Sequence, residues 1–441
     1  MWLFNHPIAP WQPADSIAIL KLMALDLTSN LSDEVLRART SLVLDTDRVK
    51  DILPDDPTSA LAALPAYASL VPDVPSFTPN MRLAYDPLSP IKPRGLSGAS
   101  NAWAASAARS ATGSTLLAND PHLGLTAPSI WYLARLELES GGVIGGTIPG
   151  MPMVLSGRSD SVGWALTSAY VDDQDIFIEE VNPDNPAEYR GPDGWVPFRT
   201  RDSIITVKDA PAVTLNLRWT ANGPVMPRGQ FDLGTITPAG HVATVAWTAL
   251  SGRDTSMSAA MEITKSRSVE DAITAGRDYI APALNLTLAD RNRVAMKVIG
   301  ALPARDIAHQ SQGRLPSFGY VPENRWLGRF PYDENPVFLD PEGGIIGNTN
   351  NKTVDLPFPR HITHVWGDTQ RINRWRRLMQ AREVHTRDSF IEAQLDTVSF
   401  AALTLSTLMG ADLWFTGDAA PLGTPERRRQ LAETVPYVPQ Q

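Results

Sequence analysis

Ser100 lies where the character of the chain changes, which raises the question of whether its hydroxyl is a nucleophile. Nine prolines between residues 54 and 93 precede it, and a short alternating run at 101–105 follows it. A serine at such a junction is most often a turn residue. To attack a carbonyl, its hydroxyl needs a base within hydrogen-bonding reach. A histidine supported by a carboxylate is one such base.

A second base is the α-amino group of the serine itself, whose ordinary pKa of about 7.7 to 8.0 suits proton transfer near neutral pH. This solution requires a cut directly in front of Ser100. The sequence contains no G-x-S-x-G elbow, so the α/β-hydrolase arrangement is excluded. Ser89 and Lys92 match S-x-x-K, but Pro90 disfavours the necessary helix, and neither S-D-N nor K-T-G accompanies them.

A series of short motifs surrounds and follows Ser100 in a fixed order. They are Ser100-Asn101-x-Trp103, Asn119-Asp120-Pro121-His122-Leu123, Ala127-Pro128-Ser129-x-Trp131-Tyr132, Pro149-Gly150-Met151-Pro152, Trp164-Ala165-Leu166-Thr167, Ala289-Asp290, Gly344-Ile345-Ile346 and Asn348-Thr349-Asn350-Asn351. His122 follows Ser100 by 22 residues. In order and spacing this series resembles the penicillin acylase (penicillin amidase) family of N-terminal nucleophile hydrolases. Because of His122, the active-site type is most similar to the cephalosporin and acyl-homoserine-lactone acylases.

The resemblance implies a role for five residues. Ser100 would cleave the chain after Ala99, and its freed α-amine would then activate its hydroxyl against the amide bond of a small N-acyl substrate. Asn350 and the backbone N–H of Ser168, with Ala169 as the alternative, would bind the oxyanion. His122 would contact the new amine and assist self-cleavage, although a buried structural histidine is the alternative. Arg371 would hold the pKa of the amine down.

The resemblance also implies a structural calcium ion, bound by the carboxylates of Asp172 and Asp175 and by the backbone carbonyl of Gln174, and no organic cofactor. Oxygen ligands in a short turn suit a hard divalent cation, and the alternative is an acidic surface turn. The family's further ligands, a glutamate from the first chain and an aspartate between Asn350 and Arg371, have no match here that the sequence identifies. His361 and His364 lie three residues apart, but without a third ligand we do not expect zinc.

These residues need a scaffold, and the apolar patterns predict a mixed one. Residues 13–46 read as two helices, and strands are expected at 101–105, 114–118, 143–146, 153–155, 162–167, 204–207, 213–219, 242–247, 284–288 and 294–299. Helices are expected at 129–139 and 268–277, and the pattern is mostly helical from about 373 to 435. The pattern predicts an α+β fold, and the resemblance implies an incomplete four-layer αββα sandwich. We divide it into a helical part of the first chain (1–53), a proline-rich spacer ending at the cleavage site (54–99), the catalytic sandwich (100–372) and a helical segment (373–441).

Composition excludes several kinds of binding partner and binding site. The net charge of −9 argues against nucleic-acid or membrane-surface binding, and the absence of cysteine excludes disulfides and thiolate metal sites. The sequence contains no apolar run of about 18 residues, so we expect no membrane-spanning helix. The N-terminus does not read as a signal peptide, whereas the resemblance implies a periplasmic or secreted protein. The processed chains would associate as a heterodimer. Compared with the family, the sequence reads as truncated at both ends, so a non-catalytic remnant is the alternative to an active acylase.

Overall fold

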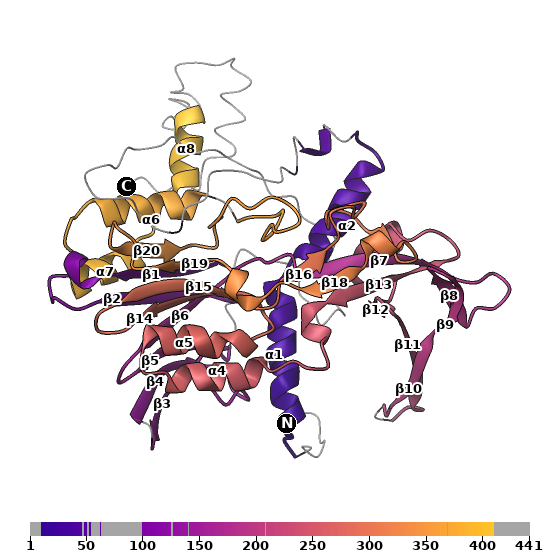
Figure 1. Ribbon diagram of the computed structural model, residues 1–441, viewed down its shortest axis with the longest axis horizontal. Helices are drawn as coiled ribbons and strands as arrows, with labels where there is room; N and C mark the ends of the chain where they lie inside the picture. Colours follow the sequence, from indigo (N-terminus) through magenta and orange to yellow (C-terminus); the bar gives the residue numbers. More distant parts are fainter. Residues whose placement is uncertain are drawn as a thin grey trace.

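Two antiparallel sheets lie face to face and carry helices on their outer faces (Figure 1). The computed structural model describes residues 10–45, 48–50, 53, 62, 99–124, 127–139, 141–207, 209–367 and 369–409. Apart from residues 62 and 99, the predicted spacer lies outside the described residues, as does the predicted helical segment beyond Met409. Within the described part of the chain, no helix is both long and apolar enough to cross a membrane.

The larger sheet has seven strands in the order β19-β15-β14-β6-β5-β4-β3. Their bounds are β3 (Tyr132–Leu138), β4 (Gly141–Thr147), β5 (Ser156–Ser159), β6 (Gly163–Ser168), β14 (Leu284–Ala289), β15 (Val294–Ile299) and β19 (Val337–Leu339). The central pair β14 and β15 is buried along its whole length, which is what two nearly continuous apolar runs predict for strands covered on both faces. Asp290 makes the turn between them, since its carboxylate accepts the N–H groups of Asn292 and Arg293.

The smaller sheet has β1 (Ala99–Ala105) at its centre, between β2 (Leu116–His122) and β20 (Ile345–Asn348). Side chains of β1 alternate between two cores, as expected for a strand buried on both faces. Ala104 packs with Met296 and Val294 of the larger sheet. Trp103 packs with the helices α6 (Gln370–Gln380) and α7 (Arg387–Gln394). Because side chains alternate between the two faces of β1, the position of Ser100 in the strand determines the face on which its side chain lies.

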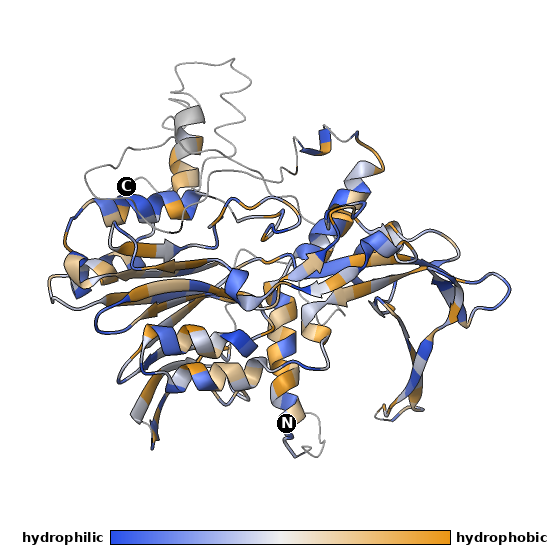
Figure 2. Ribbon diagram, viewed as in Figure 1, coloured by the Kyte–Doolittle hydropathy of each residue, from blue (hydrophilic) through white to orange (hydrophobic). Residues whose placement is uncertain are grey.

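Two further helices, α4 (Ser256–Lys265) and α5 (Val269–Ala275), cover the outer face of the larger sheet. The layers therefore run α4 and α5, larger sheet, smaller sheet, α6 and α7, and the protein is an α+β sandwich of αββα type (Figure 1). In Figure 2, α6 is largely hydrophilic on its outer side, whereas β20 beneath it is largely hydrophobic.

The remaining elements flank this sandwich. The N-terminal segment forms α1 (Pro13–Leu27) and α2 (Asn30–Ser41), as predicted, and α8 (Phe400–Met409) follows α7. The third sheet is β13 (His241–Trp247), β7 (Gln174–Glu180) and β17 (Ser317–Phe318). Smaller sheets comprise β8 (Glu188–Gly191) with β9 (Gly194–Pro197), β10 (Arg199–Ile205) with β11 (Val213–Thr220) and β12 (Gly223–Pro224), and β16 (Pro303–Arg305) with β18 (Trp326–Arg329). Short 3-10 helices are Ala107–Arg109, Gln230–Thr235, Thr248–Leu250, Gly276–Asp278, Pro322–Asn324 and Tyr332–Glu334.

Two element predictions are wrong. The segment 129–139 is not a helix, because Tyr132–Leu138 pairs with β4 as strand β3. Its Leu, Ala, Arg and Glu residues favour a helix only weakly, and pairing with a neighbouring strand overrides that preference. The segment 153–155 is not a strand, and β5 begins directly after it, at Ser156. Strand β7 was not predicted, since its acidic start was read as a loop.

Candidate active site

Ser100 lies in the central strand of the smaller sheet and is buried between the two sheets. Its exposed fraction is 8%, and its Cα pairs with that of Pro121 in β2. Because alternate residues of a strand share a face, its side chain lies on the same face as Ala102 and Ala104, toward the larger sheet. A hydroxyl on this face is shielded from bulk water by the second layer of the sandwich.

Asn350 is the centre of the hydrogen bonds around Ser100. Its side-chain Oδ1 accepts the backbone N–H of Ser100 at 2.7 Å and Nη2 of Arg371 at 3.1 Å. Its Nδ2 donates to the carbonyl oxygen of Ser168 at 2.9 Å. Only the oxygen of an amide accepts hydrogen bonds, so these three partners determine which way the amide points. The backbone of Asn350 has φ 63, a left-handed conformation that asparagine tolerates better than most residues.

A buried polar network, which the sequence did not reveal, holds Asn350 in this conformation. Oδ1 of Asn348 accepts the backbone N–H of Asn350 at 2.8 Å, the hydroxyl of Thr167 at 2.7 Å and Nδ2 of Asn285 at 3.1 Å. All four side chains are at most 2% exposed. A network whose members are all paired in a low-dielectric interior is rigid. Asn348 and Thr167 belong to motifs noted in the sequence, but they meet only because the two sheets pack together, and the β6–β14 pairing places Asn285 beside Thr167.

Ser168 ends β6 beside this network. The N–H of Ala169 donates to the carbonyl of Ala283, the residue directly before β14, at 3.2 Å, so this N–H is directed to the side of β14. The carbonyl of Ser168 points to the opposite side, toward Asn350. In an antiparallel strand, the N–H and C=O of one residue point to the same side. The geometry therefore directs the Ser168 N–H, and not that of Ala169, to the side on which Asn350 lies.

Arg371 lies in the first turn of α6 and contacts the same group. Its Nη1 donates to the carbonyl oxygen of Ser100 at 3.0 Å and to Oδ1 of Asn101 at 2.8 Å. The guanidinium thus touches Asn350, Ser100 and the residue after it. Ser100, Ser168, Asn350 and Arg371, which are distant in sequence, lie together, and Asn101 joins them.

His122 lies beside this group but on the other face of the smaller sheet. Its Cα pairs with that of Ala99, the residue before Ser100, so its side chain points toward the helices and not between the sheets. Its Nε2 is 2.9 Å from Oδ2 of Asp120, and that carboxylate also accepts Nδ2 of Asn101 at 3.3 Å. The side chain is 45% exposed, so the alternative of a buried structural histidine is wrong. Asp120, part of the quoted motif, was not singled out from the sequence.

The acidic group at the start of β7 is buried, so its interpretation as a surface turn is wrong. The exposed fractions of Asp172, Gln174 and Asp175 are 4%, 1% and 3%. Both aspartates are paired with the guanidinium of Arg305. Gln174 accepts the backbone N–H of Leu31 through Oε1 at 3.2 Å, which ties the start of β7 to α2.

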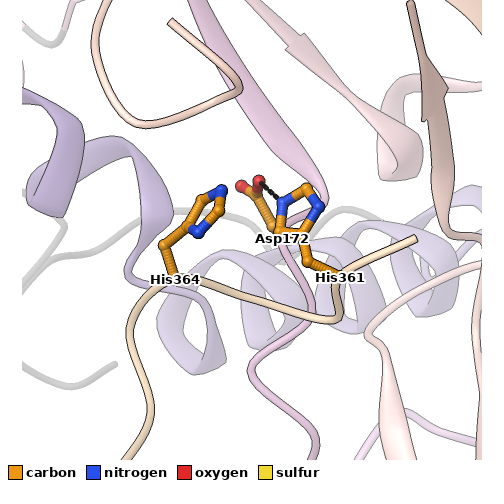
Figure 3. A group of neighbouring side chains, drawn as sticks. All are labelled: Asp172, His361 and His364. Atoms are coloured by element: carbon orange, nitrogen blue, oxygen red, sulfur yellow. Dashed lines mark hydrogen bonds and ion pairs between the residues drawn. The ribbon is translucent and has the colours of Figure 1, made fainter. Parts of the chain in front are cut away.

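Asp172 also supplies the third potential ligand that was missing for His361 and His364 (Figure 3). Nε2 of His361 is 2.8 Å from Oδ2 of Asp172, and Nε2 of His364 is 2.9 Å from the carbonyl oxygen of Gln312. The two imidazole rings are stacked, with centroids 4.1 Å apart and planes at 20°. The lone pairs of an imidazole lie in its ring plane, so two nearly parallel rings do not direct them at one ion. Burial and the neighbouring His361 lower the pKa of His364 to about 3, so it is neutral.

Comparison with known proteins shows the family of the chain. The family model described as penicillin amidase matches residues 1–434. An acyl-homoserine lactone acylase QuiP of Pseudomonas fluorescens is 28% identical over 89% of this chain and 48% of its own length. The penicillin G acylase of Escherichia coli is 26% identical over 76% of this chain and 38% of its own. The chain therefore spans about half the length of the curated relatives it matches.

A solved structure has the same fold. The thermostable penicillin G acylase from Alcaligenes faecalis superposes with a TM-score of 0.61 at 21% sequence identity, covering 75% of this chain and 57% of that one. At this identity the likeness concerns the fold alone, and it agrees with the α+β sandwich described above.

Proposed function

The chain belongs to the penicillin amidase family, and on that premise we propose that it is a self-processing amidohydrolase of small N-acyl amides with Ser100 as its nucleophile. One observation carries the proposal. The backbone nitrogen of Ser100 is held by Oδ1 of Asn350 at 2.7 Å, and Arg371 donates to the same oxygen. A nitrogen so placed has the partners that an α-amine acting as a base needs.

In the first step, Oγ of Ser100 attacks the carbonyl carbon of Ala99. The C–N bond of that peptide breaks, its nitrogen takes the hydroxyl proton, and the acyl group passes to Oγ as an ester. Water then hydrolyses the ester, leaving a carboxylate on Ala99 and a free amine on Ser100. His122 lies across from Ala99 in β2, on the other face of the sheet from the Ser100 side chain, so its proposed aid to this step acts at the backbone next to Ala99, and Asp120 would orient its ring.

In the second step, the free amine takes the proton of the Ser100 hydroxyl while Oγ attacks the amide carbonyl of the substrate. The proton passes to the leaving amine, and an acyl ester remains on Ser100. Water attacks this ester in the same way and releases the acid. A tetrahedral oxyanion forms in both half-reactions, and donors that are already oriented stabilise it most. Nδ2 of Asn350 and the N–H of Ser168 are the proposed donors.

Arg371 sets the basicity of the amine in this scheme. A guanidinium near an amine disfavours the protonated form of that amine and lowers its pKa. Its contacts to the Ser100 carbonyl and to Asn350 hold the charge in place. After cleavage, α1 and α2 remain associated with the sandwich, so the processed protein is a heterodimer of two chains.

The substrate proposed is a small molecule with an acyl group on an amide nitrogen. The names of the relatives, acyl-homoserine lactone acylase and penicillin G acylase, point to that bond. The substrate test is release of the acid from an acyl-homoserine lactone and from penicillin G.

Determining the N-terminus after expression tests self-processing directly. This chain, and in parallel any longer gene product that contains it, is expressed as wild type, Ser100→Ala and Ser100→Cys. We expect wild type to yield a fragment beginning Ser-Asn-Ala-Trp, and Ser100→Ala to stay whole and release no acid. Ser100→Cys, which keeps a nucleophile, should retain some cleavage. Cleavage at the same bond in Ser100→Ala would eliminate the mechanism.

A further inference from the structure

The aspartates at the start of β7 face a cation that belongs to the chain itself. Arg305, the last residue of β16, has a side chain that is 1% exposed. Its Nε and Nη2 bind the two oxygens of Asp175 at 2.8 and 2.9 Å. Nη2 also lies 3.1 Å from the carbonyl oxygen of Asp172 and 3.2 Å from its Oδ2. This is the bidentate geometry in which arginine binds carboxylates most strongly.

Three of the four carboxylate oxygens that Asp172 and Asp175 could offer to a calcium ion are bound by N–H donors. Both oxygens of Asp175 are bound by Arg305, and the indole Nε1 of Trp326 donates to one of them. Oδ2 of Asp172 is shared between Arg305 and His361. Calcium requires six to eight oxygen ligands whose lone pairs face it. This donor set does not fit a calcium ion while Arg305 is in place.

The space around the pair is also filled. Gly313 lies against it in a left-handed conformation with φ 77. A Cβ at this position would lie 2.7 Å from Oδ2 of Asp172 and 3.2 Å from Cζ of Arg305. The loop at Gly313 therefore packs directly against the ion pair, and on this side no space remains for a side chain.

A third carboxyl group comes from the N-terminal helices. Glu34 of α2 is 3% exposed and accepts the N–H of Ile176 in β7 at 3.2 Å. Its carboxyl group therefore lies against the strand whose start carries Asp175. The guanidinium of Arg305 pairs with both aspartates and so supplies the positive charge within this cluster.

We propose that the guanidinium of Arg305 is the permanent cation of the cluster formed by Glu34, Asp172 and Asp175, so that the chain joins α2 to β7 without calcium. The inference concerns the packed structure and holds whether or not the chain cleaves itself. The metal-binding role assigned to Asp172, Gln174 and Asp175 from the sequence is thereby replaced by an internal ion pair.

The first test uses the wild-type protein. Its melting temperature is measured in excess EDTA and in excess calcium chloride, and calcium binding is measured by equilibrium dialysis. We expect equal melting temperatures and no saturable binding. A bound calcium at one per chain, or a rise in melting temperature that saturates with calcium, would overturn the proposal.

The second test removes the internal cation. Arg305→Ala leaves buried carboxylates unbalanced and should melt well below wild type in EDTA, and calcium should restore part of the loss. The matched control is Arg329→Ala, an exposed arginine of the paired strand β18, for which we expect little change with or without calcium. Arg305→Lys keeps the positive charge but loses the bidentate geometry of the guanidinium. This variant should melt below wild type, and its melting temperature should not change with calcium. If Arg305→Ala melts at the wild-type temperature in EDTA, the proposal is wrong. If that variant does not fold, a melting temperature of Arg305→Lys that rises with calcium would contradict the proposal instead.

Discussion

The backbone N–H of Ser100 donates to the side-chain oxygen of Asn350 at 2.7 Å, although 250 residues separate the two in sequence. The nitrogen that would become the catalytic base is thus bound before any cut is made. Since the interaction uses only Oδ1, the amide nitrogen of Asn350 has a separate task, and the two tasks can be tested separately.

We predict that Asn350→Ala and Asn350→Asp differ in processing but not in turnover. Alanine removes both the acceptor for Ser100 and the proposed oxyanion donor. Aspartate keeps the acceptor for Ser100 and Arg371 but carries no N–H. Both should lose about 10²–10³ in kcat, the usual result of removing an oxyanion donor. Aspartate should be cleaved faster than alanine, as gel electrophoresis over time would show. Full turnover by Asn350→Asp would exclude its amide as a donor.

Replacement of Arg371 should change the pH profile of the processed enzyme. In Arg371→Gln the positive charge is lost, so the pKa of the Ser100 amine rises. The base must be unprotonated, so the acidic limb of kcat/KM should move to higher pH by ~1 unit, with the smallest loss at alkaline pH. The control is Arg377→Ala on the same helix, whose guanidinium lies 4.4 Å from the ring centre of Phe400. An equal loss at every pH would mean that Arg371 acts through packing alone.

A methyl group at Gly367 should disturb the site without entering it. A Cβ there would lie 2.6 Å from the carbonyl oxygen of Asn350, so the backbone of Asn350 must shift. We expect Gly367→Ala to slow cleavage and turnover by about tenfold to a hundredfold, because small misplacements of catalytic groups are costly. In Gly252→Ala, where nothing lies within 4 Å of the added Cβ, both rates should be unchanged. Comparable rates in the two variants would show that the position of Asn350 is not critical.

Stability should fall with rising pH because of Asp173. Burial raises the pKa of its carboxyl from 3.8 to about 7, although Thr248 and Trp247 donate to it. Below a pH of 3.8, the carboxyl of Asp173 is protonated in both the folded and the unfolded chain. Between the two values only the folded chain keeps the proton, so stability is lost as pH rises, and above about pH 7 the loss is complete, at most ~4 kcal/mol.

Asp173→Asn replaces this carboxyl with a group that does not ionise. The melting temperature of Asp173→Asn minus that of wild type, measured by calorimetry, should increase from about pH 5 to about pH 7 and then level off. Asp184→Asn, at an exposed position, is the control and should show no such trend. A difference that does not vary with pH would mean that Asp173 is not held protonated.

Features carried by neighbouring residues could be predicted from the sequence. The sequence predicted helices α1, α2 and α5 and most strands of the larger sheet. The hydrophobic periodicity, capping residues and turn residues that indicate these elements lie within or directly beside each of them. The block around Ser100 and His122 pointed to the family, since its residues are adjacent along two paired strands. The helix predicted over Tyr132–Leu138 was wrong because this short segment has no strong preference for helix or strand. Pairing with β4 determines its conformation.

The tertiary structure alone decided which distant groups meet. Arg305 carries no local sign that it lies between Asp172 and Asp175, and Glu34 reaches them from a helix more than a hundred residues away. The direction of the Ser168 N–H depends on the pairing of β6 with β14, and the separation of His122 from Ser100 depends on the faces of β1 and β2. Local sequence determines which conformation a segment prefers and which chemical groups it offers. Their mutual distances depend on packing between segments, which no single segment encodes.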